Sequence, residues 1–480
     1  MRYNRPMGRR ADAVIFGAGP AGLATAHRLV EKGRKVIIVE RDSQVGGLSK
    51  TIEFKKCRFD LGGHRFFTKS KKVNELWENT LGEDLLNRPR LSRICYNNNK
   101  FFDYPIRPFN ALRGFGFFMS AAVILSYIRS KICPYKEERT FEQWVTNRFG
   151  RKLFETFFKI YTEKLWAVPC SEIEAEWAAQ RIRGLSLKTA LKNAIFPDKK
   201  GSIKTLIHEF KYPKYGPGMM YEKLAGNISC KGASINLNAE VVKIVREDFL
   251  IKGVIVRNKD GTDHTCNASH FVSSIPITET IKRLSPQPPK EVLAAAFALK
   301  YRSFIAVNVI LDSAALFPDT WIYIHAPQVR LGRIQNFKKW SPYMVPEDGT
   351  TALGLEYFCT EGDDLWSMRD EELINFGMEE LEKIGLGKKK DFQDGFVARV
   401  PKAYPVYDSA YREKLIIIRR FIENFENLQV VGRHGMFKYN NMDHSILTGL
   451  YAAENILCGC RKHDIWSLNA NPEYHEEDLE

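Results

Sequence analysis

The pattern of apolar and polar residues near the N-terminus predicts a strand, a tight turn and a helix. Residues 14–16 form a continuous apolar run, as in a buried strand, and a second strand is predicted at 35–40, around the apolar residues 36–39. Between them, Gly17, Gly19 and Gly22 indicate a glycine turn followed by the start of a helix. Glycine allows the backbone to turn tightly between a strand and a helix. The pattern therefore predicts a strand–helix–strand unit of about the 30 residues that such a unit needs.

Further along the chain, helical and strand patterns occur in separate blocks. Helical periodicity is dense from Phe101 to about Leu206, and the segment 141–150 ends in glycine as a helix commonly does. Alternating and apolar runs from 299 to 357 predict an antiparallel sheet. We therefore expect an α/β fold of three domains. The expected boundaries are 10–104, 212–285 and 396–465 for a discontinuous Rossmann-like domain, 105–211 for an inserted helical domain and 286–395 for an antiparallel-sheet domain.

One stretch has the composition of a membrane segment. Residues 114–128 are uncharged and lie between Arg113 and Arg129. They fall short of the roughly 20 residues that a helix needs to span a bilayer, so we expect a buried helix. The alternative is a helix that dips into a membrane surface, which the positive charge around the stretch favours.

Charge and cysteine content narrow the classes of partner and compartment. The net charge of +15 suits a phosphorylated substrate, an anionic membrane surface or nucleic acid, and equally a solvated basic surface without a partner. The basic residues are spread widely with no nucleic-acid-binding module around them, so we expect no nucleic acid. Nine cysteines form neither a disulfide framework nor a paired metal site, and we expect no metal. The close pair Cys458 and Cys460 is interpreted as incidental. A reducing cytosol fits this content.

The N-terminal glycines indicate the chemistry of a bound dinucleotide. Gly17 and Gly19 let the backbone approach a pyrophosphate, and Gly22 lets the helix pack close to the strand. The helix start then offers N–H groups to the phosphates. Glu40 follows Gly22 by 18 residues, the distance at which a carboxylate accepts hydrogen bonds from a ribose.

The segment after Glu40 resembles the FAD-binding start of the amine oxidase, phytoene desaturase and UDP-galactopyranose mutase superfamily. A second glycine pair, Gly46-Gly47, and a third, Gly62-Gly63 before His64, carry this resemblance. It implies a Rossmann-like fold of the GR2 type with FAD as cofactor, and places His64 against the flavin ring. The residues implied to bind the cofactor are Gly17, Gly19, Pro20, Ala21, Gly22, Glu40, Arg41, Gly46, Gly47, Leu48, Gly62, Gly63, His64, Val242, Gly432, Arg433, Asn441, Met442, Asp443 and Ser445.

Other segments resemble the UDP-galactopyranose mutases more narrowly, especially the eukaryotic branch. These are 154–181, Arg302, 401–407 and 428–445. Two arginines are suitable ligands for a diphosphate, because each planar guanidinium can bind phosphate oxygens bidentately. The resemblance implies catalytic roles for His64, Arg181, Arg302 and Arg433. It implies substrate-binding roles for Phe157, Thr162, Trp166, Arg181, Arg302, Tyr404, Tyr439 and Asn440.

The leading functional hypothesis is therefore an FAD-dependent pyranose–furanose mutase, acting on a nucleotide-diphosphate sugar such as UDP-galactopyranose in cell-surface glycan biosynthesis. By resemblance, N5 of reduced FAD acts as the nucleophile with no net redox change. Residues 105–135 do not match the uridine clamp of a mutase, so the diphosphate is implied more firmly than the uridine. The alternatives are an FAD-dependent oxidoreductase of the amine oxidase and desaturase type, and a non-catalytic flavin protein that docks on an anionic surface. A cytoplasmic location is expected, with peripheral membrane association and a homo-oligomer left open.

Overall fold

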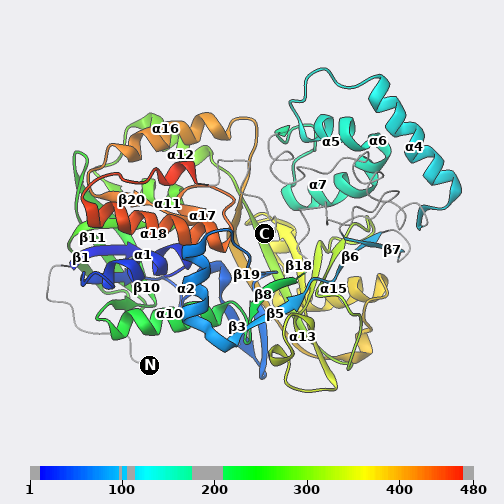
Figure 1. Ribbon diagram of the computed structural model, residues 1–480, viewed down its shortest axis with the longest axis horizontal. Coiled ribbons are helices and arrows are strands. Elements are labelled where there is room, and N and C mark those ends of the chain that lie inside the picture. Colours follow the sequence, from blue (N-terminus) through cyan, green and yellow to red (C-terminus); the bar gives the residue numbers. More distant parts are fainter. Residues whose placement is uncertain (1–10, 97–99, 105–113, 176–208, 469–480) are drawn as a thin grey trace.

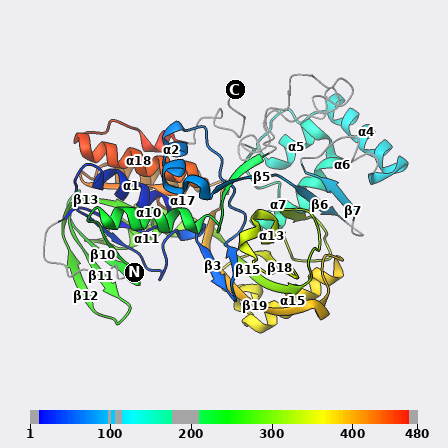
Figure 2. The same cartoon turned by 60° about the horizontal axis from the view of Figure 1, so that its bottom comes forward.

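Two sheet-containing parts lie side by side in the structure, a computed structural model that describes residues 11–96, 100–104, 114–175 and 209–468 (Figure 1). One part holds a five-stranded sheet with β1 (Ala11–Phe16) near its centre, and it contains both the first and the last described segments. The other part holds a seven-stranded sheet, and the helices α4 to α7 lie beyond that sheet (Figures 1 and 2).

The five-stranded sheet is parallel and confirms the strand–helix–strand unit. Strand β1 pairs with β2 on one side and with β13 on the other. Residues 13–16 are fully buried, as expected for a parallel sheet with both faces covered. In spatial order the strands are β20 (Leu428–Val430), β13 (Ala268–Ser273), β1, β2 (Val36–Val39) and β9 (Ser234–Asn236).

Helices α1 (Pro20–Val30) and α18 (Met442–Cys458) pack against each other beside this sheet. The two helices approach closely at Gly449, where an added Cβ would lie 2.2 Å from the carbonyl oxygen of Ala21. The Thr25 hydroxyl donates to the Gly449 carbonyl at 3.1 Å, which fixes the register of the two helices.

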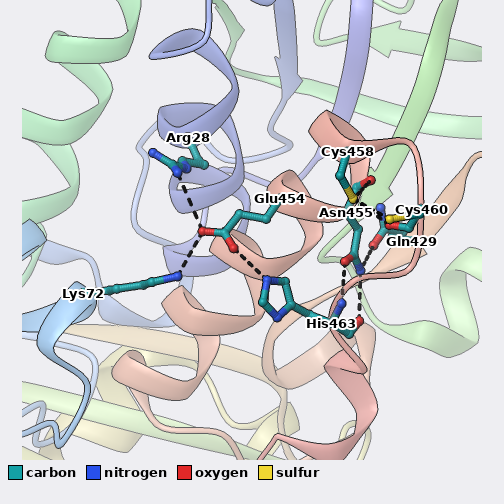
Figure 3. A network of polar contacts seen from close by, with 8 residues as sticks. All are labelled: Arg28, Lys72, Gln429, Glu454, Asn455, Cys458, Cys460 and His463. Atoms are coloured by element: carbon teal, nitrogen blue, oxygen red, sulfur yellow. Dashed lines mark hydrogen bonds and ion pairs between the residues drawn. The ribbon is translucent and has the colours of Figure 1, made fainter.

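A polar network ties the C-terminal end of α18 to its neighbours (Figure 3). Glu454 accepts hydrogen bonds from Lys72 of α2 (Lys71–Leu81) at 3.1 Å and pairs with His463 at 2.7 Å. Its carboxylate also lies 3.8 Å from the Arg28 guanidinium of α1. Asn455 exchanges hydrogen bonds with the backbone of His463. This network connects the C-terminal end of α18 with α1, α2 and the segment that follows α18.

The second part is built on a mixed seven-stranded sheet. Its order is β19 (Phe392–Pro405), β15 (Tyr301–Asp312), β18 (Thr350–Cys359), β17 (Arg333–Asn336), β16 (Trp321–Ile324), β6 (Ser92–Tyr96) and β7 (Lys100–Asp103). The predicted antiparallel strands between 299 and 357 are present, but β16 and β6 pair in parallel. Strands β6, β7 and much of β19 fall inside ranges assigned to the Rossmann-like domain. Their pattern predicts strands but carries no signal for the sheet they join, so the domain boundaries stay a prediction.

The smaller sheets and the remaining helices complete the two parts. A four-stranded sheet contains β12 (Asp263–Cys266), β11 (Leu250–Asn258), β10 (Ala239–Glu247) and β14 (Leu284–Ser285). Two further sheets have two antiparallel strands each. One pairs β3 (Thr51–Phe54) with β4 (Cys57–Asp60), and the other pairs β5 (Leu85–Pro89) with β8 (Glu209–Pro213). The other helices are α10 (Gly218–Cys230), α11 (Ile277–Lys282), α12 (Lys290–Ala298), α13 (Phe337–Trp340), α14 (Asp364–Ser367), α15 (Asp370–Lys383), α16 (Tyr411–Glu423) and α17 (Gly432–Gly435).

The helical block contains α4 (Phe117–Ile132), α5 (Phe141–Phe149), α6 (Arg151–Leu153), the π-helical turn η4 (Phe154–Lys159) and α7 (Ile160–Trp166). Helix α5 confirms the predicted helix with a glycine end: Thr140 and Gln143 form a capping box, and Gly150 follows with φ +84°. The expectation that 114–128 is a buried helix is wrong. Only Val123 and Ser130 of α4 are buried, because the helix packs by one face alone. Among the described helices, none combines the length and apolarity that a bilayer span needs.

Candidate active site

A cavity of about 740 Å³ lies between the two parts and contains most of the predicted site residues. Its walls come from the strand ends and helix starts around the five-stranded sheet, and from β15, β17 and β19 of the seven-stranded sheet. Ligands of open parallel sheets bind at the carboxyl ends of the strands, because loops and helix N-termini meet there. The position of the cavity therefore matches that of a dinucleotide site.

The glycines after β1 form a bare backbone cradle at one end of the cavity. An added Cβ at Gly22 would lie 2.0 Å from the Gly17 carbonyl oxygen, so α1 sits directly against the turn. Gly47 has φ +55°, and an added Cβ there would lie 3.3 Å from the Cα of Gly19. No side chain caps α1 at Gly19. Backbone N–H groups at the helix start are thus presented to the cavity, as a pyrophosphate requires.

Glu40 stands at the end of β2 and lines the cavity. Its carboxylate accepts the Ala18 N–H at 2.6 Å and the Asp42 N–H at 2.8 Å. Burial raises the pKa of Glu40 above its ordinary value, while the two backbone N–H groups act to lower it. These hydrogen bonds fix the carboxyl group where the ribose of a dinucleotide is expected.

The first turn of α18 forms a second helix N-terminus at the same cavity. Asn441 occupies the N-cap position, and the next residues of the helix line the cavity with it. Gly432, with φ +77°, brings α17 up to Ala21: an added Cβ would lie 2.9 Å from the Ala21 side chain. The N-termini of α1 and α18 together make this end of the cavity favourable for a negatively charged ligand.

Most of the residues predicted to bind the cofactor line the cavity. They are Gly17, Gly19, Pro20, Ala21, Glu40, Arg41, Gly47, Leu48, Gly62, Gly63, His64, Gly432, Arg433, Asn441, Met442, Asp443 and Ser445. Three others do not: Gly22, Gly46 and Val242. Gly22 and Gly46 act through the backbone turns. Val241 lines the cavity in place of Val242, because neighbouring residues of a strand face opposite sides and β10 also carries a bulge here.

An arginine and two tyrosines that line the cavity form a stacked cluster. The rings of Tyr404 and Tyr439 stack with centroids 5.8 Å apart and an interplanar angle of 21°. The Arg433 guanidinium lies 4.0 Å from the Tyr439 ring centroid and 5.0 Å from that of Tyr404. Its Nε donates to the Ala403 carbonyl at 3.0 Å, which fixes the plane of the guanidinium. Trp166 meets both tyrosine rings edge-on.

His64 borders the same space and is neutral at ordinary pH. Burial, together with the nearby Arg333 and Arg433 charges, lowers its pKa to about 4, although the contact with the Gly62 carbonyl acts to raise it. Its Nδ1 lies 3.2 Å from the Gly62 carbonyl oxygen. This contact assigns the proton to Nδ1 and leaves Nε2 as a hydrogen-bond acceptor.

A buried polar network beside Gly62 and Gly63 was not predicted from the sequence. Arg333 donates through Nε and Nη2 to one oxygen of Glu356, at 2.9 and 2.6 Å, and Gln335 donates to the other oxygen at 2.7 Å. An added Cβ at Gly63 would lie 3.0 Å from Gln335 Nε2. Arg333 and Gln335 line the cavity. Their spacing by two in a strand pattern places both on one sheet face, which is the signal that identifies them.

Several predicted substrate residues lie away from the cavity wall, whereas Tyr404, Tyr439 and Asn440 line it. Phe157 is buried edge-on against Phe102, with ring centroids 5.1 Å apart, and Thr162 is also buried. Arg302 is buried and donates to the Leu165 carbonyl at 3.2 Å and to the Thr360 hydroxyl. Arg181 lies outside the described residues.

Comparison with protein families identifies one match that spans nearly the whole chain. The sequence profile described as flavin containing amine oxidoreductase matches residues 20–457. A probable UDP-galactopyranose mutase of Klebsiella pneumoniae is 28% identical over 246 residues, which make up 50% of this chain and 58% of that protein. The match thus spans less than two thirds of that relative.

Solved structures with the same fold include a reduced UDP-galactopyranose mutase. It superimposes with a TM-score of 0.82 at 21% identity, over 96% of this chain and 98% of the other. A putative protoporphyrinogen oxidase from Exiguobacterium sp. 255-15 gives a TM-score of 0.71 at 17% identity, over 94% and 99% of the two chains. The α/β fold predicted from the sequence is therefore confirmed.

Proposed function

Because this chain belongs to the flavin containing amine oxidoreductase family, we propose that it is a flavin-dependent mutase that interconverts the pyranose and furanose forms of a diphosphate-linked hexose. The observation that carries this proposal is the cluster of Arg433, Tyr404 and Tyr439 in the cavity. A fixed guanidinium plane and phenol hydroxyls are donors suited to phosphate oxygens. An apolar or simple amine substrate has no use for such donors.

The cavity fits FAD as the flavin. Gly17, Gly19 and Gly47 leave room for a diphosphate against bare backbone, and Glu40 stands ready to accept hydrogen bonds from the ribose. Asn441 and Asp443 at the start of α18 would hold the polar end of the flavin. These residues would bind the cofactor and leave the arginine and tyrosine cluster for the substrate.

When bound in its reduced form, the flavin would supply the nucleophile for the anomeric carbon, with no net redox change. The chain itself would bind, orient and exclude water. Neutral His64 would accept a hydrogen bond at Nε2, and Arg433 would hold the leaving diphosphate. Arg181 and Arg302 stay proposed diphosphate ligands on the sequence resemblance alone. The product would serve glycan biosynthesis from a cytoplasmic nucleotide-diphosphate sugar.

An assay of the purified protein with UDP-galactofuranose, with and without dithionite, tests this function. We expect the pyranose form to appear only after reduction, without consumption of reductant in proportion to product. Oxygen or NADPH consumption coupled to substrate conversion would contradict the mutase and establish an oxidoreductase. A flavin that binds without any turnover across a panel of sugar diphosphates would support a non-catalytic protein.

The substitution Arg433→Lys tests the cluster directly. Loss of the planar guanidinium should raise the KM for the sugar diphosphate about tenfold, equivalent to about 1.4 kcal/mol, while the flavin absorbance stays unchanged. The matched control is Arg419→Lys, because Arg419 lies over the Trp466 ring at 5.3 Å but does not line the cavity. Loss of flavin from the Arg433 variant would refute its assignment to the substrate.

A further inference from the structure

Helix α4 presents an uncovered apolar face to solvent. Six of its large apolar side chains are exposed, from 47% for Ile124 and Ile128 to 88% for Phe118. The six are Phe117, Phe118, Ile124, Leu125, Ile128 and Ile132. Only eight other large hydrophobic residues are exposed in the whole described part of the chain. Scattered exposed apolar residues are normal on a protein surface, but a contiguous group marks an interaction site.

The exposed side chains lie on a single face of the helix. At about 100° per residue, the six positions fall within an arc of roughly 120°. The two buried residues, Val123 and Ser130, lie on the opposite side and face the rest of the helical block. A surface helix of a globular domain usually turns its apolar face toward the core. Helix α4 instead turns its apolar arc toward solvent.

Positive charge borders this arc on both sides. Arg129 and Lys131 follow at the two edges of the arc by the same helical geometry, and both are exposed. From 104 to 136 the sequence contains five Lys and Arg residues and no Asp or Glu. Such an apolar stripe with cationic borders matches the headgroup and acyl boundary of an anionic bilayer.

We propose that α4 docks in the plane of an anionic phospholipid bilayer, with the six apolar side chains inserted and Arg129 and Lys131 at the headgroups. Sixteen residues of helix extend about 24 Å, short of the hydrocarbon thickness of about 30 Å, so the helix lies on the membrane. A second copy of the chain fits this face less well, because two identical cationic borders would meet and repel.

The position of α4 suits such docking. The helix forms the outer edge of the molecule, on the far side of the helical block from the five-stranded sheet (Figures 1 and 2). Its inner side is held firmly: the Lys152 N–H donates to the Ser126 hydroxyl at 3.0 Å, and an added Cβ at Gly150 would lie 2.9 Å from the Tyr127 Cα. Docking of α4 would therefore carry the whole molecule to the bilayer. The proposed docking of α4 does not depend on the proposed mutase activity.

Co-sedimentation of the full-length, flavin-loaded protein with vesicles tests the proposal. We expect strong binding to vesicles of phosphatidylglycerol and phosphatidylcholine, at least tenfold weaker binding to phosphatidylcholine alone, and a decrease in binding as salt rises. Equal binding to both kinds of vesicle, or to neither, would overturn the proposal.

Substitutions on α4 locate the contact. The triple variant Phe117→Ser, Phe118→Ser and Leu125→Ser should lose at least tenfold in vesicle affinity, and Arg129→Gln about fivefold. The matched controls are Phe297→Ser, whose side chain on α12 is 67% exposed, and Lys259→Gln, which should both bind like the parent protein.

Retained flavin absorbance and an unchanged far-ultraviolet spectrum will show that the variants are folded. Undiminished binding of the folded triple variant would refute the docking by α4. Light scattering without vesicles provides the remaining test: a dimer of the parent protein that the same substitutions dissociate would assign the face to a second copy and refute the membrane. The test of docking and the test of catalysis are independent, because vesicle binding is measured without substrate.

Discussion

At the scale of single residues, burial keeps the imidazoles of His325 and His64 uncharged. His325 is 4% exposed, and its ring stacks on Tyr161 with centroids 5.2 Å apart. Burial lowers the pKa of His325 to about 3, and the nearby Lys164 ammonium lowers the pKa in the same direction. His64 follows the same rule in the cavity. Both imidazoles are thus neutral in the folded protein throughout the neutral pH range.

The lowered pKa of His325 predicts a specific loss of stability in acid. In the unfolded chain the imidazole binds a proton below about pH 6.5, whereas in the folded protein it does so only below about pH 3. Between these limits the unfolded state binds more protons, so the free energy of unfolding falls as the pH falls, by up to about 1.4 kcal/mol per pH unit. The variant His325→Phe keeps a ring for stacking but cannot titrate.

Thermal unfolding of the parent protein and the His325→Phe variant between pH 7 and pH 4.5 measures this effect. We expect the Tm of the parent protein to fall more steeply toward acid than the Tm of the variant. Parallel Tm profiles would show that His325 does not titrate differently in the folded and unfolded states.

At the scale of elements, the contact between α1 and the turn after β1 sets the shape of the backbone cradle at the cavity. An added Cβ at Gly22 would lie 2.0 Å from the Gly17 carbonyl oxygen, a distance that requires the backbone to move. Gly226 in α10 offers the contrast, since an added Cβ there meets nothing within 4 Å. Replacement of each of these helical glycines by alanine therefore distinguishes the effect of close packing on stability from the effect of helix propensity.

The variant Gly22→Ala should therefore lose flavin and stability together. We expect the free energy of unfolding to fall by about 2–3 kcal/mol, with flavin released during purification. Gly226→Ala should keep its flavin and gain about 0.5–1 kcal/mol, because alanine restricts the unfolded chain. Denaturant unfolding and the flavin absorbance measure both outcomes. A flavin-loaded, fully stable Gly22→Ala protein would contradict the close approach of α1 to the turn.

At the scale of the whole molecule, the ion pair of Arg333 and Glu356 lies inside the seven-stranded sheet, where the Gly62 turn packs against it. It connects β17 and β18 of the seven-stranded sheet, and an added Cβ at Gly62 would lie 3.6 Å from both side chains. Although desolvation acts to lower it, the pKa of Arg333 is raised well above its ordinary value, chiefly by the Glu356 charge. Removal of that charge would leave a guanidinium in a largely buried place without its counterion.

The variant Glu356→Gln should destabilise the protein by about 3 kcal/mol and weaken flavin binding through the displaced Gly62 loop. The matched control is Asp263→Asn, which removes the bidentate partner of Arg257 in an exposed strand pair and should change the Tm little. Denaturant unfolding and flavin titration provide the measurements. Equal, small effects of both substitutions would show that the buried pair contributes little to stability or to flavin binding.

The sequence by itself determined the strand–helix–strand unit at the glycine-lined end of the cavity. The strand, the glycine turn, α1 and Glu40 are contiguous or closely spaced, so local backbone rules place them correctly. The α18 start was likewise recognisable, because its residues lie in one short motif. Functional residues that lie close together in the sequence can be predicted before the fold is known.

Only the tertiary structure decided the surroundings of the arginine and tyrosine cluster and the exposure of α4. Arg333 and Glu356 are 23 residues apart and meet because β17 and β18 pair in one particular register. Arg302 and Phe157 matched a motif yet lie buried away from the cavity wall, since the packing around a strand or helix decides where its side chains end. The apolar stretch of α4 reads alike whether buried or exposed. Whether this helix is buried or exposed depends on the elements that pack against it, and the composition of the stretch does not specify them.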